Sequence, residues 1–180
     1  VADTPQSCGV VNFFEESMRR YVLIPSAAIL RRDLVIELGG FPEGMRMGED
    51  QYLWTKIARC AAVAFSPVPM AIYSRAASNR SAAIFRPEQT KFSLEDLYDV
   101  EASAISNEYV ARVALGKALV ESTRGGTAQA QRAVEFFAYN KLSGKLMRKV
   151  KVLNRLPAKL RPSVMAVYNW LAWAIARKGL

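Results

Sequence analysis

Glycine and proline are closely spaced between positions 39 and 50, and they constrain the local fold more than any other feature of this chain. Residues 33–38 have the composition of a short helix, which Gly39-Gly40 would end by adopting a left-handed conformation. Pro42 and Gly44 predict a tight turn, because proline fixes φ and glycine permits a positive φ. A second helix is expected over residues 50–60, where apolar side chains recur at helical spacing.

Two adjacent carboxylates, Glu49 and Asp50, stand where this second helix begins. The positive end of the helix dipole favours negative charge at this position. On spacing alone, Asp50 is a helix cap, which would contribute roughly 1 kcal/mol. A carboxylate at a helix N-terminus can equally serve as a general base if it faces a cleft, and the two roles are compatible.

Three segments around these acids, taken in order, resemble the family 2 glycosyltransferases of the GT-A fold. They are residues 24–32 (IPSAAILRR), 38–43 (LGGFPE) and 48–54 (GEDQYLW), and a later stretch, PVPMAIY at 67–73, fits the same pattern. The resemblance covers about residues 10 to 82. It implies an α/β fold, in which residues 1–90 are the C-terminal part of a Rossmann-like GT-A catalytic domain.

The resemblance also implies a reaction and a set of site residues. Such enzymes transfer a sugar, with inversion, from a nucleotide-sugar donor to a glycan or lipid-linked acceptor. Asp50 would be the base that deprotonates the acceptor hydroxyl, with Glu49 as a supporting acid. Trp54 and Ser26 would bind substrate. Arg75 and Arg80 are further substrate-binding candidates because of their charge and not because of the family pattern, since either could meet the departing nucleoside diphosphate as a cation.

Several of these positions also have simpler interpretations. Trp54 has the spacing of a core residue, and Ser26 is small enough to serve only close packing. Arg31 and Arg32 could meet a diphosphate as charge-assisted donors, but a solvated basic pair before a helix is equally consistent with the sequence.

The chain departs from the family in two respects. It contains no Asp-x-Asp, the motif through which such enzymes hold Mg²⁺ or Mn²⁺, so the metal expected for the intact enzyme would have its ligands outside this chain. Ala76 stands near the position where the family often has a histidine, and the chain has no histidine at all. This excludes imidazole bases and His-ligated zinc.

Because the donor-binding half is missing and the first residue is Val, we expect the chain to be part of a longer protein and inactive in isolation. The two cysteines are too few for a disulfide framework, which favours a reducing compartment.

Other segments predict further elements and a division into three parts. A buried strand is expected over residues 21–30, and a short apolar run over 61–65 leads into an extended edge through 73. Helices are expected from Ser93 to Ile105, from Asn107 to the stop at Gly125-Gly126, and from Thr127 to Asn140. The parts are the catalytic portion at 1–90, a mainly helical extension at 91–144 and a basic tail at 145–180.

The basic charge belongs to the end of the chain. Residues 136–180 contain ten Lys or Arg and no acid, whereas residues 1–135 balance to a net −1. Residues 145–156 form an amphipathic basic helix, and residues 164–176 are almost wholly apolar, with Trp170 and Trp173. Thirteen helical residues span roughly 20 Å, which is short of the ~30 Å bilayer core.

This composition favours binding to an anionic membrane surface through residues 145–180 over binding to nucleic acid. The corresponding location is peripheral, on the cytoplasmic face of a membrane. Docking of the last helix on its own domain stays open. A second function is open as well: a non-catalytic helical module that binds anionic membrane or a protein partner.

Overall fold

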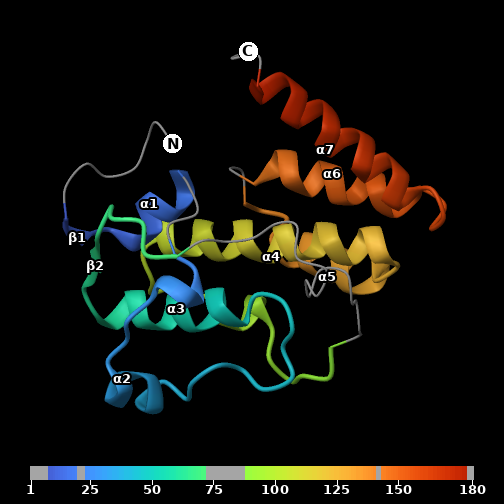
Figure 1. Cartoon of the computed structure of the whole chain (residues 1–180). Coiled ribbons are helices and arrows are strands. Elements are labelled where there is room, and N and C mark those ends of the chain that lie inside the picture. The colour runs from blue at the N-terminus through green and yellow to red at the C-terminus, as the bar shows by residue number, and fades with distance from the viewer. Residues whose placement is uncertain (1–7, 20–22, 72–87, 141–142, 178–180) are drawn as a thin grey trace. The chain divides into compact units, whose positions relative to one another are not determined.

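Helices dominate the computed structural model, which describes residues 8–19, 23–71, 88–140 and 143–177 (Figure 1). The chain divides into two units, residues 1–110 and 111–180, and the boundary falls inside helix α4 (Ala104–Arg124). The first unit thus extends beyond the predicted limit at residue 90, and the second joins the basic tail to part of the helical extension.

The first unit combines short helices with one small sheet. Strands β1 (Gly9–Val11) and β2 (Val63–Phe65) pair antiparallel, with Val10 opposite Ala64. Its remaining elements are α1 (Phe13–Arg19), a 3-10 helix at Pro25–Ala27, α2 (Arg32–Glu37), α3 (Glu49–Cys60), a 3-10 helix at Leu94–Leu97 and the start of α4.

The expected α/β class is wrong for the described part of the chain, where seven α-helices accompany a single two-stranded sheet. A Rossmann-like half needs parallel strands joined by crossover helices. The predicted strand at 21–30 is wrong over its described residues, 23–30. Pro25 opens a 3-10 turn there, and the extended residues on either side, Ile24 and Ala28, join no described strand.

The core of the first unit forms where α1, α3 and α4 present apolar side chains. Phe13 and Phe14 pack edge-on at 5.5 Å between ring centroids, and Tyr109 lies 5.4 Å from Phe13. Leu53 of α3 is fully buried. Leu53 lies near the middle of α3, and the two ends of the helix are left to carry polar groups.

The predicted helix from Ser93 to Ile105 is a 3-10 turn followed by irregular chain. Ser93 and Asp96 do form a capping box, but the helix that it opens ends at Leu97. Asn107 does not cap a new helix either, because α4 has already begun at Ala104. Instead, its amide donates to the carbonyl of Asp99 at 2.7 Å and fixes the irregular segment against α4.

The second unit is helical throughout its described residues. After α4 ends at Gly125, whose φ is 105°, come α5 (Thr127–Phe136), α6 (Gly144–Arg155) and α7 (Arg161–Arg177). Helices α5 and α6 pack together around Val134, Phe137 and Val150. No helix in the described ranges has the length and apolarity that crossing a bilayer requires.

Candidate functional site

The predicted helix–turn–helix around residues 33–60 is confirmed. Helix α2 ends where Gly39 and Gly40 adopt φ of 83° and 68°, and the N–H of Gly40 donates back to the carbonyl of Val35 at 2.8 Å. Pro42 then opens a turn, since the N–H of Met45 donates to its carbonyl at 3.3 Å. Met45 is buried, which ties the turn to the body of the first unit.

The segment that begins at Glu88 braces this turn from outside. Glu88 Oε1 accepts hydrogen bonds from the N–H groups of Arg46 at 3.1 Å and Met47 at 3.0 Å. At Gly44, φ is 76°, and a Cβ there would lie 2.1 Å from the carbonyl oxygen of Gln89. Only glycine fits a backbone approach this close. Sequence reasoning missed this brace because no local pattern connects the two segments.

The two carboxylates lie in the first turn of α3. The N-cap is Gly48, with φ of 89°, so Asp50 is not the capping residue that spacing alone predicts. Glu49 and Asp50 are both half-buried, and Asp50 Oδ1 accepts a hydrogen bond from the N–H of Gln51 at 2.8 Å. The loop therefore directs two acids to the positive end of a 12-residue helix.

Trp54 follows one turn after Asp50 and is buried, with 4% of its surface exposed. Its ring meets Phe41 edge-on at 6.0 Å, so the two aromatic side chains close the loop over α3. The indole Nε1 is buried and has no hydrogen-bond partner in the part of the chain that the structure describes. A buried donor in this state costs about 1–3 kcal/mol, and such groups often mark a place where a ligand or water binds.

The other predicted site residues are distributed differently. Ser26 is exposed in the 3-10 helix at Pro25–Ala27, on a separate element from the carboxylates. Arg31 and Arg32 are exposed at the start of α2. Arg75, Arg80 and Ala76 lie outside the described residues. The structure thus places Glu49, Asp50 and Trp54 on one helix and Ser26 on another element.

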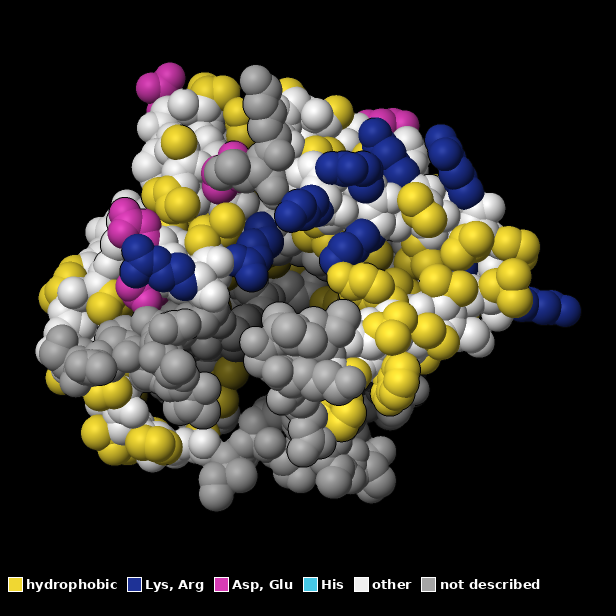
Figure 2. Space-filling model, turned by 90° about the horizontal axis from the view of Figure 1, so that it is seen from above, with side chains coloured by type: hydrophobic (Ala, Val, Ile, Leu, Met, Phe, Trp, Pro, Cys, Tyr) yellow, Lys and Arg dark blue, Asp and Glu magenta, His cyan; other side chains and the backbone are white. Residues whose placement is uncertain are grey.

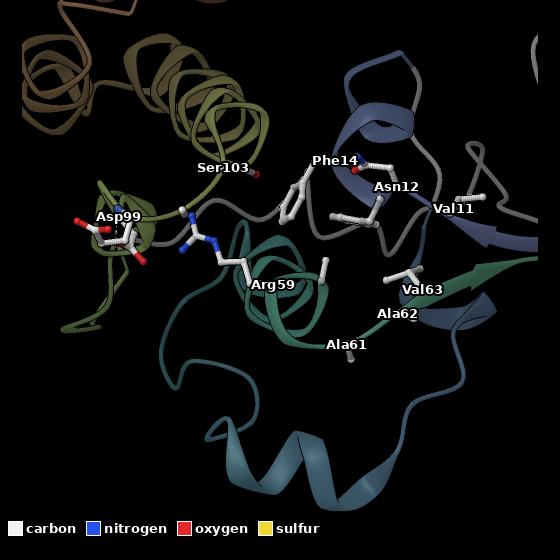
Figure 3. A pocket seen from close by; sticks show the side chains of 13 residues that line it. Val11, Asn12, Phe14, Arg59, Ala61, Ala62, Val63, Asp99 and Ser103 are labelled. Atoms are coloured by element: carbon white, nitrogen blue, oxygen red, sulfur yellow. Dashed lines mark hydrogen bonds between the residues drawn. The ribbon is translucent and has the colours of Figure 1, made fainter.

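A pocket of about 560 Å³ opens at the opposite end of α3 (Figure 3). Arg59 reaches into it toward Asp99, while its Nε donates to Ser106 Oγ at 2.8 Å. Burial lowers the pKa of Arg59, and the Asp99 carboxylate opposes that shift. Asp50 and Arg59 are nine residues apart on one helix, roughly 14 Å along its axis, so this pocket is separate from the carboxylate pair.

Among the described residues, no three His, Cys, Asp or Glu side chains gather closely enough to hold a metal ion. The Mg²⁺ or Mn²⁺ expected for an intact enzyme therefore has no site that these residues fit. No protein-family model, curated protein or solved structure matches this chain.

Proposed function

We propose that this chain is the acceptor-side part of an inverting, nucleotide-sugar-dependent glycosyltransferase. One observation carries the proposal: Glu49 and Asp50 lie together in the first turn of α3. The loop before them has glycines at positive φ, and its backbone is held by hydrogen bonds to Glu88. The order of the sequence segments around that loop supports it. The proposal concerns the loop and α3 and does not depend on an α/β fold.

In this reaction Asp50 would act as the general base. Its carboxylate accepts the proton of the acceptor hydroxyl while the hydroxyl oxygen attacks the anomeric carbon of the donor sugar. The new glycosidic C–O bond forms on the face opposite the breaking C–O bond, and the nucleoside diphosphate departs with the bonding electron pair. Glu49, beside the base, would orient the acceptor. We assign the metal no residue of this chain.

The remaining predicted residues have binding roles in the proposal. The indole N–H of Trp54 has no hydrogen-bond partner among the described residues, which supports a hydrogen bond from it to an acceptor hydroxyl. Ser26 stays assigned to substrate binding on the resemblance alone, and Arg75 or Arg80 on its charge, as a cation for the departing nucleoside diphosphate. The acceptor would be a glycan or lipid-linked precursor, and the intact enzyme would work peripherally on the cytoplasmic face of a membrane.

The test uses the intact polypeptide with its donor-binding half. Asp50→Asn should reduce release of nucleoside diphosphate from a panel of uridine- and guanosine-diphosphate sugars by roughly 10²–10⁴-fold. Asp33→Asn is the matched control, because Asp33 also lies in the first turn of a helix, α2, but is exposed there. Turnover that Asp50→Asn leaves undiminished would remove Asp50 as the base.

A second candidate is a non-catalytic helical module that binds anionic membrane or a protein partner. The observation that favours it is the large exposed apolar surface of α7, including Trp170 and Trp173. The two candidates separate cleanly in one experiment. An intact polypeptide that transfers no sugar with any donor of the panel, yet binds anionic vesicles, would support the module.

A further inference from the structure

Helix α6 has its apolar side occupied within the second unit. Met147, Val150 and Leu153 are buried in the second unit's core, where α6 packs on α5. The opposite side is strongly basic and exposed, and it comprises Lys145, Arg148, Lys149, Lys151 and Arg155. The amphipathic pattern of α6 is therefore explained by protein packing, and its apolar side cannot also enter a bilayer.

Helix α7 is different, because most of its described apolar side chains are exposed. Trp170 is 61% exposed, Trp173 54% and Val167 58%. Among the residues of α7 whose exposure the structure describes, only Arg161 is buried. Apolar patches of this extent on a protein surface mark an interaction site.

Two contacts hold α7 beside the basic side of α6. Arg161, at the start of α7, donates from Nε to the carbonyl of Leu156 at 2.9 Å and from Nη2 to that of Asn154 at 3.3 Å. Further along, Lys149 of α6 donates to the hydroxyl of Tyr168, and its ammonium lies 4.5 Å from the centre of that ring. The exposed apolar and basic side chains therefore belong to one continuous surface, on which Figure 2 shows yellow and dark-blue groups together.

Charge identifies the partner of this surface. Residues 136–180 carry ten Lys or Arg and no acid, so the partner must be anionic. The partner must also bind the apolar side chains of tryptophan, leucine and valine. Nucleic acid fits this requirement less well, because the proteins that bind it alternate aromatic with polar side chains. The headgroup region of an anionic bilayer offers both properties, and tryptophan prefers that depth.

We propose that α7 binds the surface of an anionic lipid bilayer, with Trp170 and Trp173 inserted among the headgroups and the Lys and Arg side chains of α6 contacting lipid phosphates. A helix of 17 residues is about 26 Å long and offers a correspondingly broad strip for this contact. The inference does not rest on sugar transfer, because it uses no residue of the first unit.

The first test is co-sedimentation of the full chain with vesicles of phosphatidylcholine alone or with about one third phosphatidylserine. Binding should occur only to the anionic vesicles and should fall at least roughly tenfold for Trp170→Ser/Trp173→Ser. The control is Val10→Ser/Val100→Ser, which removes exposed apolar side chains from the first unit. Equal binding to neutral vesicles, or equal losses in both double variants, would overturn the proposal.

The contribution of charge is tested with a second matched pair. Lys151→Glu/Arg155→Glu should weaken binding to anionic vesicles several-fold more than Lys91→Glu/Arg132→Glu, although both pairs change the net charge by the same amount. All four side chains are exposed, so neither pair should unfold the protein. Identical losses would mean that only the total charge matters, which contradicts a localised surface.

Tryptophan fluorescence of the Trp54→Phe variant gives a direct readout of insertion. Of the three tryptophans, Trp54 is buried in the first unit, while Trp170 and Trp173 are exposed. Bromine-labelled lipids should therefore quench most of the emission that Trp54→Phe retains. Absence of quenching would overturn insertion into the bilayer. Tighter binding to single-stranded RNA than to vesicles would make nucleic acid the partner, and dimerisation that Trp170→Ser abolishes would make it a second copy of the chain.

Discussion

The carboxylate of Glu88 accepts a hydrogen bond from the backbone N–H of Met47 at 3.0 Å, although 41 positions separate the two residues. The same oxygen accepts from the N–H of Arg46 at 3.1 Å. Thr90 adds a third link, since its Oγ1 donates to the carbonyl of Glu43 at 2.8 Å. The loop that leads into α3 is thus held through its backbone by residues 88–90, in addition to the glycines and the buried Met45 of the loop itself.

Glu88→Ala should lower the free energy of unfolding by about 1–2 kcal/mol, because two backbone donors lose a charged acceptor. Urea denaturation followed by circular dichroism measures this. Glu88→Gln keeps one acceptor oxygen and should recover a large part of the loss. The control is Glu37→Ala, at the exposed end of α2. A loss as large for Glu37→Ala as for Glu88→Ala would contradict the role assigned to Glu88.

Alanine substitutions at Gly44 and Gly39 distinguish the cost of a left-handed backbone from the cost of a steric clash with Gln89. Both have positive φ, at 76° and 83°, so alanine at either should cost about 1–2 kcal/mol for the left-handed conformation. At Gly39 nothing lies within 4 Å of an added Cβ, whereas at Gly44 the carbonyl oxygen of Gln89 lies at 2.1 Å. Gly44→Ala should therefore be worse than Gly39→Ala by roughly 1–3 kcal/mol in thermal or urea unfolding. Equal costs would show that the loop can move away from Gln89.

The sequence predicted the fold best where glycine sets the backbone. The ends of α2 and α4 fall at Gly39 and Gly125, as expected, because a positive φ is a local property of one residue. The sequence predicted the fold least well in apolar runs. Residues 23–30 have no hydrophobic periodicity that distinguishes a strand from the 3-10 turn and extended residues found there. The capping box at Ser93 is present, yet a cap only begins a helix and says nothing about its length.

For the candidate site, sequence reasoning located Asp50 at the start of a helix but did not find what positions it. The brace by Glu88 depends on chain segments that meet only in the folded protein. The pocket around Arg59 was missed for the same reason, because its partner Ser106 comes from another helix. Contacts between distant segments leave no spacing that a single sequence can show.

Tyr52 gives the protein a predicted sensitivity to alkaline pH. Burial raises the pKa of its phenol above the ordinary 10.0, and the Asp96 carboxylate raises it further. The folded state therefore holds this proton more tightly than the unfolded state does. The protonated Tyr52 therefore contributes to the free energy of unfolding. This contribution is fully present below pH 10.0 and is lost as the pH rises from there through the pKa of the folded state. Tyr52→Phe should flatten this part of the stability profile, whereas Tyr139→Phe, at an exposed ring, should leave it unchanged. Identical profiles for Tyr52→Phe and the unmodified chain would contradict the prediction.

Arg161 is a buried charged residue at the start of α7 in the second unit. Its guanidinium donates to three backbone carbonyls, those of Leu156 at 2.9 Å and of Ser122 and Asn154 at 3.3 Å each. Two of these carbonyls belong to the end of α6, where no further turn of helix satisfies them. One side chain therefore closes the end of α6, contacts α4 and fixes where α7 begins.

Arg161→Leu should destabilise the second unit by about 2–4 kcal/mol, because it leaves buried carbonyls without donors. Arg161→Lys should recover only part of this, since an ammonium cannot reach three carbonyls in the fork geometry of guanidinium. Arg155→Leu makes the same change at an exposed position of α6 and should stay within about 0.5 kcal/mol of the unmodified protein. Urea unfolding followed by circular dichroism at 222 nm, which reports helix content, measures all three. A lysine variant as stable as the arginine protein would show that charge alone is needed, and the multiple hydrogen bonds would then not explain the position of α7.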